Sequence, residues 1–205
     1  EFCRQLMAQG AQVSGTARSA ESSNRLAANL HQRLLLDLES SASIDQLAAY
    51  LLTQPLDGIV FASGLVAFGS IAETPHSVAD RLMKVNALGQ IQLAQALLPR
   101  LTESANPFVL TISGVISEQP MAGLTAYSAS KTAIAGFGAA ASKELRKLGI
   151  NWIDARPGHT ESGLADRAIF GSAPNFGAGK QVVDVVSRMV IAITNEERDL
   201  PSSSF

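Results

Sequence analysis

The sequence predicts a doubly wound α/β domain, in which helices cover both faces of a parallel sheet. Short runs of consecutive apolar residues, such as 59–62 and 108–112, alternate with longer segments of helical apolar period. Apolar runs of this kind indicate strands buried on both faces, and their alternation with helices indicates parallel pairing. Neither an internal repeat nor a linker interrupts the pattern, so residues 1–205 are expected to form one domain.

The expected elements follow in regular order. The strands are predicted over residues 11–16, 33–36, 59–62, 108–112 and 150–155. The helices are predicted over residues 2–9, 21–29, 43–52, 78–101 (as two consecutive helices), 126–148 and 181–194. The first helix ends at Gly10, a residue that suits the left-handed cap position. The Gly/Ser/Ala-rich segment 162–180 is the one long irregular connection, and we interpret it as a lid over a site rather than as a disordered loop.

Composition excludes several classes of function. The net charge of −2 and the pI near 5.9 provide no electrostatic basis for binding nucleic acid or an anionic membrane. There is no run of 18 apolar residues, so no membrane span is expected. A single cysteine, Cys3, excludes an intramolecular disulfide and suits a reducing compartment, so we expect a cytoplasmic protein. One cysteine and three dispersed histidines indicate no metal site.

The strongest chemical signal lies in the predicted helix over 126–148. Tyr127 and Lys131 are four residues apart there, so their side chains project from the same face one turn apart. An ammonium beside a phenol stabilises the phenolate and lowers the tyrosine pKa. Such a phenol can exchange a proton with a carbonyl or alcohol oxygen. Alone, the spacing is common, and its simplest interpretation is a solvated helix face.

Further segments occur in the correct order around this pair, and together they resemble the short-chain dehydrogenase/reductase family. The matching segments are residues 10–13, 16–19, 36–38, 61–64, 85–89, 112–114 and 157–162. The elements around Asn86, around Tyr127 and Lys131, and around Pro157-Gly158 are specific when found in register. The resemblance runs to about residue 195 and implies a Rossmann-type sheet that binds a nicotinamide dinucleotide.

The resemblance also implies roles for individual residues. Tyr127 would be the general acid in reduction and the general base in oxidation, and Lys131 would lower its pKa and bind the nicotinamide ribose. Asn86 would hold a water in a proton relay to Lys131, although it could instead cap a helix. The implied cofactor-binding residues are Arg18, Asp37, Leu38, Ala62, Ser63, Gly64, Tyr127, Lys131, Pro157, Gly158, Thr160 and Ser162. His159 beside this turn is interpreted as an incidental loop histidine.

Arg18 carries the expected cofactor preference. NAD-specific sites place an acidic side chain at the end of this strand for the ribose hydroxyls, and here the segment Gly15-Thr16-Ala17-Arg18 has none. A guanidinium suits a 2′-phosphate through charge-assisted hydrogen bonds. NADP(H) is therefore expected over NAD(H), unless Arg18 is simply a surface arginine.

The chain departs from the family pattern at three places. A first strand and its glycine-rich turn, which would face the pyrophosphate, are missing; the loss is about a dozen residues. We therefore expect this chain to be a fragment, with an open slot in the sheet. The serine expected 13 residues before Tyr127 is replaced by Gly114, and Ser113 lies one position earlier, on the opposite strand face unless the segment bulges. Residues 61–64 lack the two usual asparagines.

The resemblance thus implies an oxidoreductase that moves hydride between NADPH and a carbonyl or alcohol substrate. Ile169, Phe170, Pro174 and Phe176 in segment 162–180 indicate a partly apolar substrate. Small residues along 133–141 agree with a helix interface of a homodimer or homotetramer, or with tight packing on the chain's own sheet. Two alternatives remain: a dinucleotide-binding sensor that has lost turnover, which Gly114 favours, and a structural domain that binds no cofactor.

Overall fold

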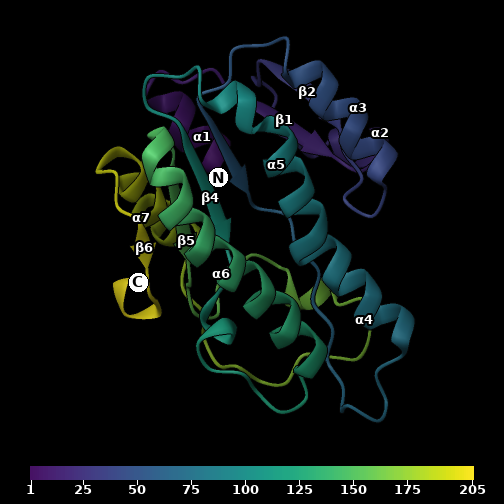
Figure 1. Ribbon diagram of the computed structural model, residues 1–205. Helices are drawn as coiled ribbons and strands as arrows, with labels where there is room; N and C mark the ends of the chain where they lie inside the picture. The colour runs from purple at the N-terminus through teal and green to yellow at the C-terminus, as the bar shows by residue number, and fades with distance from the viewer.

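A computed structural model describes residues 1–205 and shows helices on both sides of a parallel sheet (Figure 1). The strands are β1 (Ser14–Ala17), β2 (Gln32–Leu35), β3 (Gly58–Phe61), β4 (Phe108–Ile112), β5 (Asn151–Ala155) and β6 (Asp199–Leu200). Every pairing between them is parallel, and the register aligns Ile59 with Val109 and Val109 with Trp152. The predicted fold class, a Rossmann-type doubly wound sheet, is confirmed.

Helices pack on the two faces according to the alternation of strand side chains. They are α1 (Phe2–Ala8), α2 (Ala20–Ser23), α3 (Ser41–Leu51), α4 (His76–Met83), α5 (Gly89–Leu101), α6 (Thr125–Leu145) and α7 (Val182–Thr194). Val109 and Trp152 share a core with residues of α3, α5 and α6, whereas Leu110 and Ile153 share one with residues of α7. Successive residues of β4 and β5 thus bury on opposite faces, which explains why apolar residues occupy consecutive positions in both strands.

The sheet is interrupted between β1 and β3. β1 pairs only with β2, and the second sheet has the order β3-β4-β5-β6, so β1 and β3 do not bond to each other. The interruption falls where the sequence predicts an open slot. That the chain is a fragment of a longer protein stays a prediction.

The element boundaries differ from expectation in a few places. Helix α2 has four residues and stops at Ser23, far short of the expected residue 29, although Ser19 caps its start. Helix α3 begins at Ser41, because Ser40 supplies the cap by accepting a hydrogen bond from the Ser43 N–H. β6 was not predicted, since its two residues carry no periodic signal. None of the helices combines the length and the apolar character that crossing a bilayer requires.

One irregular helical turn positions a residue of the candidate site. A π-helical turn, η1 (Lys84–Leu88), joins α4 to α5, and the Gly89 N–H bonds to the carbonyl of Lys84. The buried Gln90 side chain fills this wide turn by donating to the carbonyls of Val85 (3.1 Å) and Ser63 (3.3 Å). Such π-turns occur often at functional sites, and this one presents Asn86 toward α6.

Candidate active site

A cavity of about 690 Å³ opens beyond the carboxyl ends of β3, β4 and β5. Doubly wound sheets bind their ligands at this edge. Among its lining residues are Ala62, Ser63, Gly64, Tyr127, Lys131, Pro157, Gly158, Thr160 and Ser162, all expected from the sequence. The cavity therefore brings together most of the predicted site residues, which come from the loops after β3 and β5 and from α6.

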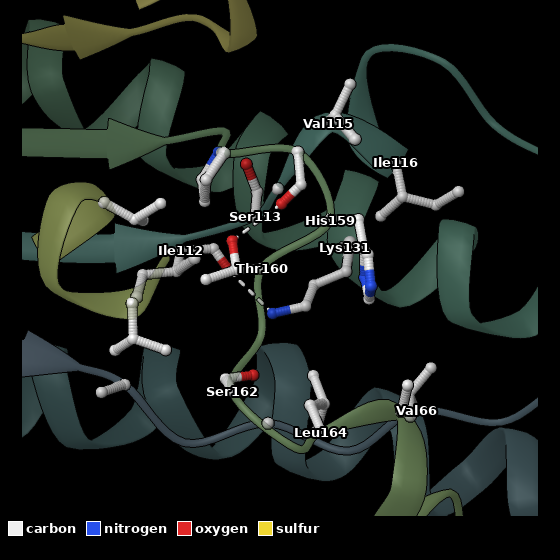
Figure 2. A pocket seen from close by; sticks show the side chains of 18 of the residues that line it. Val66, Ile112, Ser113, Val115, Ile116, Lys131, His159, Thr160, Ser162 and Leu164 are labelled. Atoms are coloured by element: carbon white, nitrogen blue, oxygen red, sulfur yellow. Dashed lines mark hydrogen bonds between the residues drawn. The ribbon is translucent and has the colours of Figure 1, made fainter. Parts of the chain in front are cut away.

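Lys131 crosses the cavity to the end of β4 (Figure 2). Its side chain is 5% exposed, and Nζ donates a 2.6 Å hydrogen bond to the carbonyl of Ile112. Burial lowers the Lys131 pKa to about 8, while the negative charge of Asp154 acts in the opposite direction. The residue is thus a buried ammonium rather than the solvated lysine of the simplest interpretation.

Tyr127 lies one helical turn before Lys131 and is partly buried. The Lys131 Nζ is 6.0 Å from the centre of the phenol ring. Burial raises the Tyr127 pKa to about 12, which corrects the expected lowering. The physical reason is desolvation of the phenol by burial, while the Lys131 ammonium is directed at the Ile112 carbonyl. In this geometry Tyr127 is a protonated phenol at neutral pH.

Asn86 is a brace beneath the site. The side chain is fully buried; Oδ1 accepts from the Leu65 N–H (2.8 Å), and Nδ2 donates to the Leu65 carbonyl (2.9 Å) and to Ser130 Oγ (3.0 Å). It therefore ties the loop after β3 to the helix that carries Tyr127 and Lys131. Asn86 does not line the cavity, and the water relay expected of it stays a prediction.

The end of β4 bulges at Ser113 and Gly114. Both N–H groups donate to the carbonyl of Ala155, at 3.0 and 3.1 Å, so two residues face one. Gly114 has φ +76°, a conformation that favours glycine. The Ser113 hydroxyl donates to Asp154 Oδ2 (2.6 Å) and accepts from Ser117 Oγ (3.1 Å). The bulge that would let Ser113 take the place of the expected serine is present, yet the Ser113 hydroxyl is hydrogen-bonded to Asp154.

Three predicted cofactor residues lie outside the cavity. Arg18 follows β1 with a side chain that is 65% exposed and 3.9 Å from Glu39, a carboxylate held mainly by Arg81. Asp37 accepts from the Glu39 N–H (2.9 Å) in the turn before α3. Leu38 is buried in the core. Of these three side chains, that of Arg18 is the exposed one, so its guanidinium is accessible to a ligand.

Segment 162–180 lies across the cavity. The Phe68 N–H donates to the Phe170 carbonyl and the Ile169 N–H to the Val66 carbonyl, each at 2.9 Å. Leu164 and Phe176 of this segment line the cavity. The segment is irregular apart from one short turn, η4 (Ala165–Arg167), as its composition predicts.

Two features of the site were not expected from the sequence. The His159 ring stacks 5.2 Å from the Phe176 ring and lines the cavity, although it was interpreted as incidental. Asp154 is a buried carboxylate behind the bulge. An acidic residue inside the predicted strand 150–155 was the available signal for Asp154, and the position beside the Pro157-Gly158 turn was the available signal for His159.

A parallel doubly wound sheet with its cavity at the carboxyl ends of the strands places the chain in the class of Rossmann-type domains. The model of the short chain dehydrogenase family matches residues 1–169. The chain therefore belongs to the short chain dehydrogenase family.

Relatives and solved structures agree with this assignment. The chain is 25% identical over 173 residues to "Dehydrogenase/reductase SDR family member 7B" of Danio rerio, covering 80% of this chain and 56% of that protein. It is 29% identical over 146 residues to "Dehydrogenase/reductase SDR family protein 7-like" of Drosophila melanogaster, covering 70% and 45%. The chain thus spans about half the length of these curated relatives.

Solved structures share the fold. A short-chain dehydrogenase from Sphingobium yanoikuyae in complex with NADPH superposes with a TM-score of 0.86 at 20% identity, covering 98% of this chain and 81% of that one. A short-chain dehydrogenase from Streptomyces avermitilis gives a TM-score of 0.86 at 24% identity, covering 99% and 84%.

The buried ammonium predicts a specific pH dependence of stability. Because the folded-state pKa of Lys131 is about 8 against 10.5 for a free lysine, the unfolded chain binds more protons between those values. Stability of the wild type should therefore rise with pH across that window relative to Lys131→Met, by about 2 kcal/mol between pH 7 and pH 10. Urea denaturation of both proteins at each pH measures the difference.

Lys143→Met, at an exposed position of the same helix, is the control. A pH-independent difference between the wild type and Lys131→Met would contradict the burial of a charged ammonium.

Proposed function

We propose that this chain carries an NADPH-dependent oxidoreductase site that moves hydride between the cofactor and a carbonyl or alcohol. The observation that supports this most is the placement of Tyr127 and Lys131 in one cavity with Gly64 and the Pro157-Gly158 turn. Because the chain spans about half of its curated relatives, its activity, substrate and cofactor belong to this proposal.

The residues present suit a nicotinamide dinucleotide. A Cβ on Gly64 would lie 3.4 Å from Asn86 Oδ1 and 3.6 Å from Lys131 Nζ, so glycine leaves the approach to the ammonium open. Lys131 would hold the ribose hydroxyls, and Ser162 with the Pro157-Gly158 turn would hold the carboxamide. Related folds were solved with NADPH and with NADH, the latter a reductase from Brucella melitensis. The bound cofactor supplies the hydride.

The protein's own part is proton transfer. A phenol whose pKa is raised to about 12 keeps its proton at neutral pH, so Tyr127 is poised to donate it to a carbonyl oxygen during reduction. The Lys131 ammonium, 6.0 Å from the ring, favours the phenolate that remains.

Apolar walls favour an apolar carbonyl substrate. Val66, Phe68, Ile116 and Leu124 form a buried cluster that Tyr127 contacts. Leu164 and Phe176 extend the cluster from segment 162–180, which we propose closes over the substrate and excludes water.

The main alternative is a dinucleotide-binding sensor without turnover. Gly114 has no side chain to bind a substrate oxygen, and the neighbouring Ser113 hydroxyl is committed to Asp154. Retention of Tyr127 and Lys131 in one cavity favours the enzyme.

Assembly and location extend the proposal. Gly136, Ala139 and Ala140 are exposed on α6, which supports close helix contact in a homodimer or homotetramer. A cytoplasmic location stays a prediction.

Removing the phenol hydroxyl tests the proposed chemistry. Tyr127→Phe should lower NADPH-dependent reduction on the order of 10²–10⁴-fold because the general acid is lost. The decrease in NADPH absorbance with a panel of ketones, aldehydes and quinones measures it, and NADPH affinity should change little.

Tyr50→Phe is the matched control, since Tyr50 lies on α3 and bonds Gln32. Equal turnover by Tyr127→Phe and the wild type would refute the assignment. Saturable NADPH binding by the wild type without turnover on any substrate would favour the sensor.

Arg18 should determine the preference for NADPH. Arg18→Ala should weaken NADPH binding about 10- to 100-fold, the loss expected for a hydrogen bond to a charged group, and leave NADH binding unchanged. Fluorescence titration with each cofactor measures this. Arg25→Ala removes another exposed arginine and serves as control. Equal losses for both cofactors would refute a 2′-phosphate contact.

A further inference from the structure

A buried carboxylate lies behind the active-site end of β4, and the proposed chemistry does not use it. Asp154 on β5 is 5% exposed. Its Oδ1 accepts from Thr111 Oγ1 (3.0 Å), and its Oδ2 accepts from Ser113 Oγ (2.6 Å) and Arg156 Nη1 (3.0 Å). Burying a carboxylate is costly unless it is paired and hydrogen-bonded, so this arrangement needs a reason.

The two hydroxyl groups that bind Asp154 flank the acceptor of Lys131. Thr111 and Ser113 are the residues on either side of Ile112, whose carbonyl receives the ammonium at 2.6 Å. The Ser113 hydroxyl is thereby directed toward Asp154 on β5. Asp154 thus holds, through hydrogen bonds, the residues on both sides of Ile112, whose carbonyl oxygen accepts the hydrogen bond from Lys131.

The local charges leave Asp154 available to balance Lys131. The Arg156 guanidinium that touches Asp154 is also bound by Glu118, which follows the short turn η2 (Val115–Ser117), and by Asp199 of β6. α6 contributes Lys131 and the phenol of Tyr127. Since one arginine is shared among three carboxylates, it does not cancel the charge of Asp154.

We propose that Asp154 is a positioning residue for Lys131: it holds the end of β4 that receives the ammonium and supplies the buried negative charge that keeps that ammonium protonated. The direction of its effect on the Lys131 pKa, opposite to that of burial, agrees with this. The inference deepens the proposed function, because it concerns the residue assigned to the cofactor and to Tyr127.

The test follows protonation of Lys131 directly and needs no turnover. The ¹³Cε resonance of Lys131, assigned by its loss in Lys131→Arg, is titrated by NMR in the full chain. Asp154→Asn should lower the titration midpoint by about half a pH unit or more, because an amide of similar shape lacks the charge. Asp199→Asn, which removes a carboxylate from the same guanidinium at an exposed site, should leave it unchanged. An unchanged midpoint in Asp154→Asn overturns the proposal.

Ser113→Ala keeps the test decisive if Asp154→Asn does not fold. It removes the shortest hydrogen bond to the carboxylate and so loosens the end of β4 that receives the ammonium, and the midpoint should fall by a smaller amount than in Asp154→Asn. An unchanged midpoint in a folded Ser113→Ala protein overturns the positioning role.

Measurements of turnover distinguish a failure of this inference from a failure of the proposed function. If the wild type reduces carbonyl compounds, the alkaline limb of its pH–rate profile should move to lower pH in Asp154→Asn. If no variant turns over, the proposed function fails while the titration still decides the role of Asp154.

Discussion

The burial of one ammonium group organises the active-site end of this domain. Lys131 is nearly inaccessible to solvent, and its single hydrogen-bond partner is a backbone carbonyl at the end of β4. A buried cation must be compensated, and the carboxylate of Asp154 is the nearby negative charge that acts on it. Asn86 and the bulge at Ser113 and Gly114 hold the elements around it. The strand ends, the π-turn and α6 are thereby held in one arrangement.

The same burial acts in opposite directions on the two members of the pair. It lowers the pKa of Lys131 and raises that of Tyr127, because in each case the charged form loses hydration. In the ligand-free geometry the phenol is therefore a proton donor. A polar ligand beside both groups would change that balance, so cofactor binding and proton transfer are coupled in the proposed function.

Local patterns predicted the class of fold and the pair because apolar runs, helical period and the spacing of Tyr127 and Lys131 are short-range signals. The bulge at Gly114, the partners of Asn86 and the commitment of Ser113 to Asp154 depend on contacts between segments about 20 to 45 residues apart. The Tyr127 pKa also depends on such contacts. The spacing of Tyr127 and Lys131 indicated an ammonium nearby, but it could not show that this ammonium is directed at the Ile112 carbonyl. The length of α2 was overestimated and the two-residue strand β6 was missed, because such short elements carry no periodic signal.

The central claim is that the cavity beside Lys131 takes a nicotinamide dinucleotide. The most direct measurement is a fluorescence titration of the folded chain with NADPH, with Lys131→Met in parallel. The account predicts saturable binding that the substitution weakens about tenfold or more, the loss expected for a hydrogen bond to a charged group. Absence of saturable binding to a chain shown by circular dichroism to be folded would contradict it and favour a structural domain.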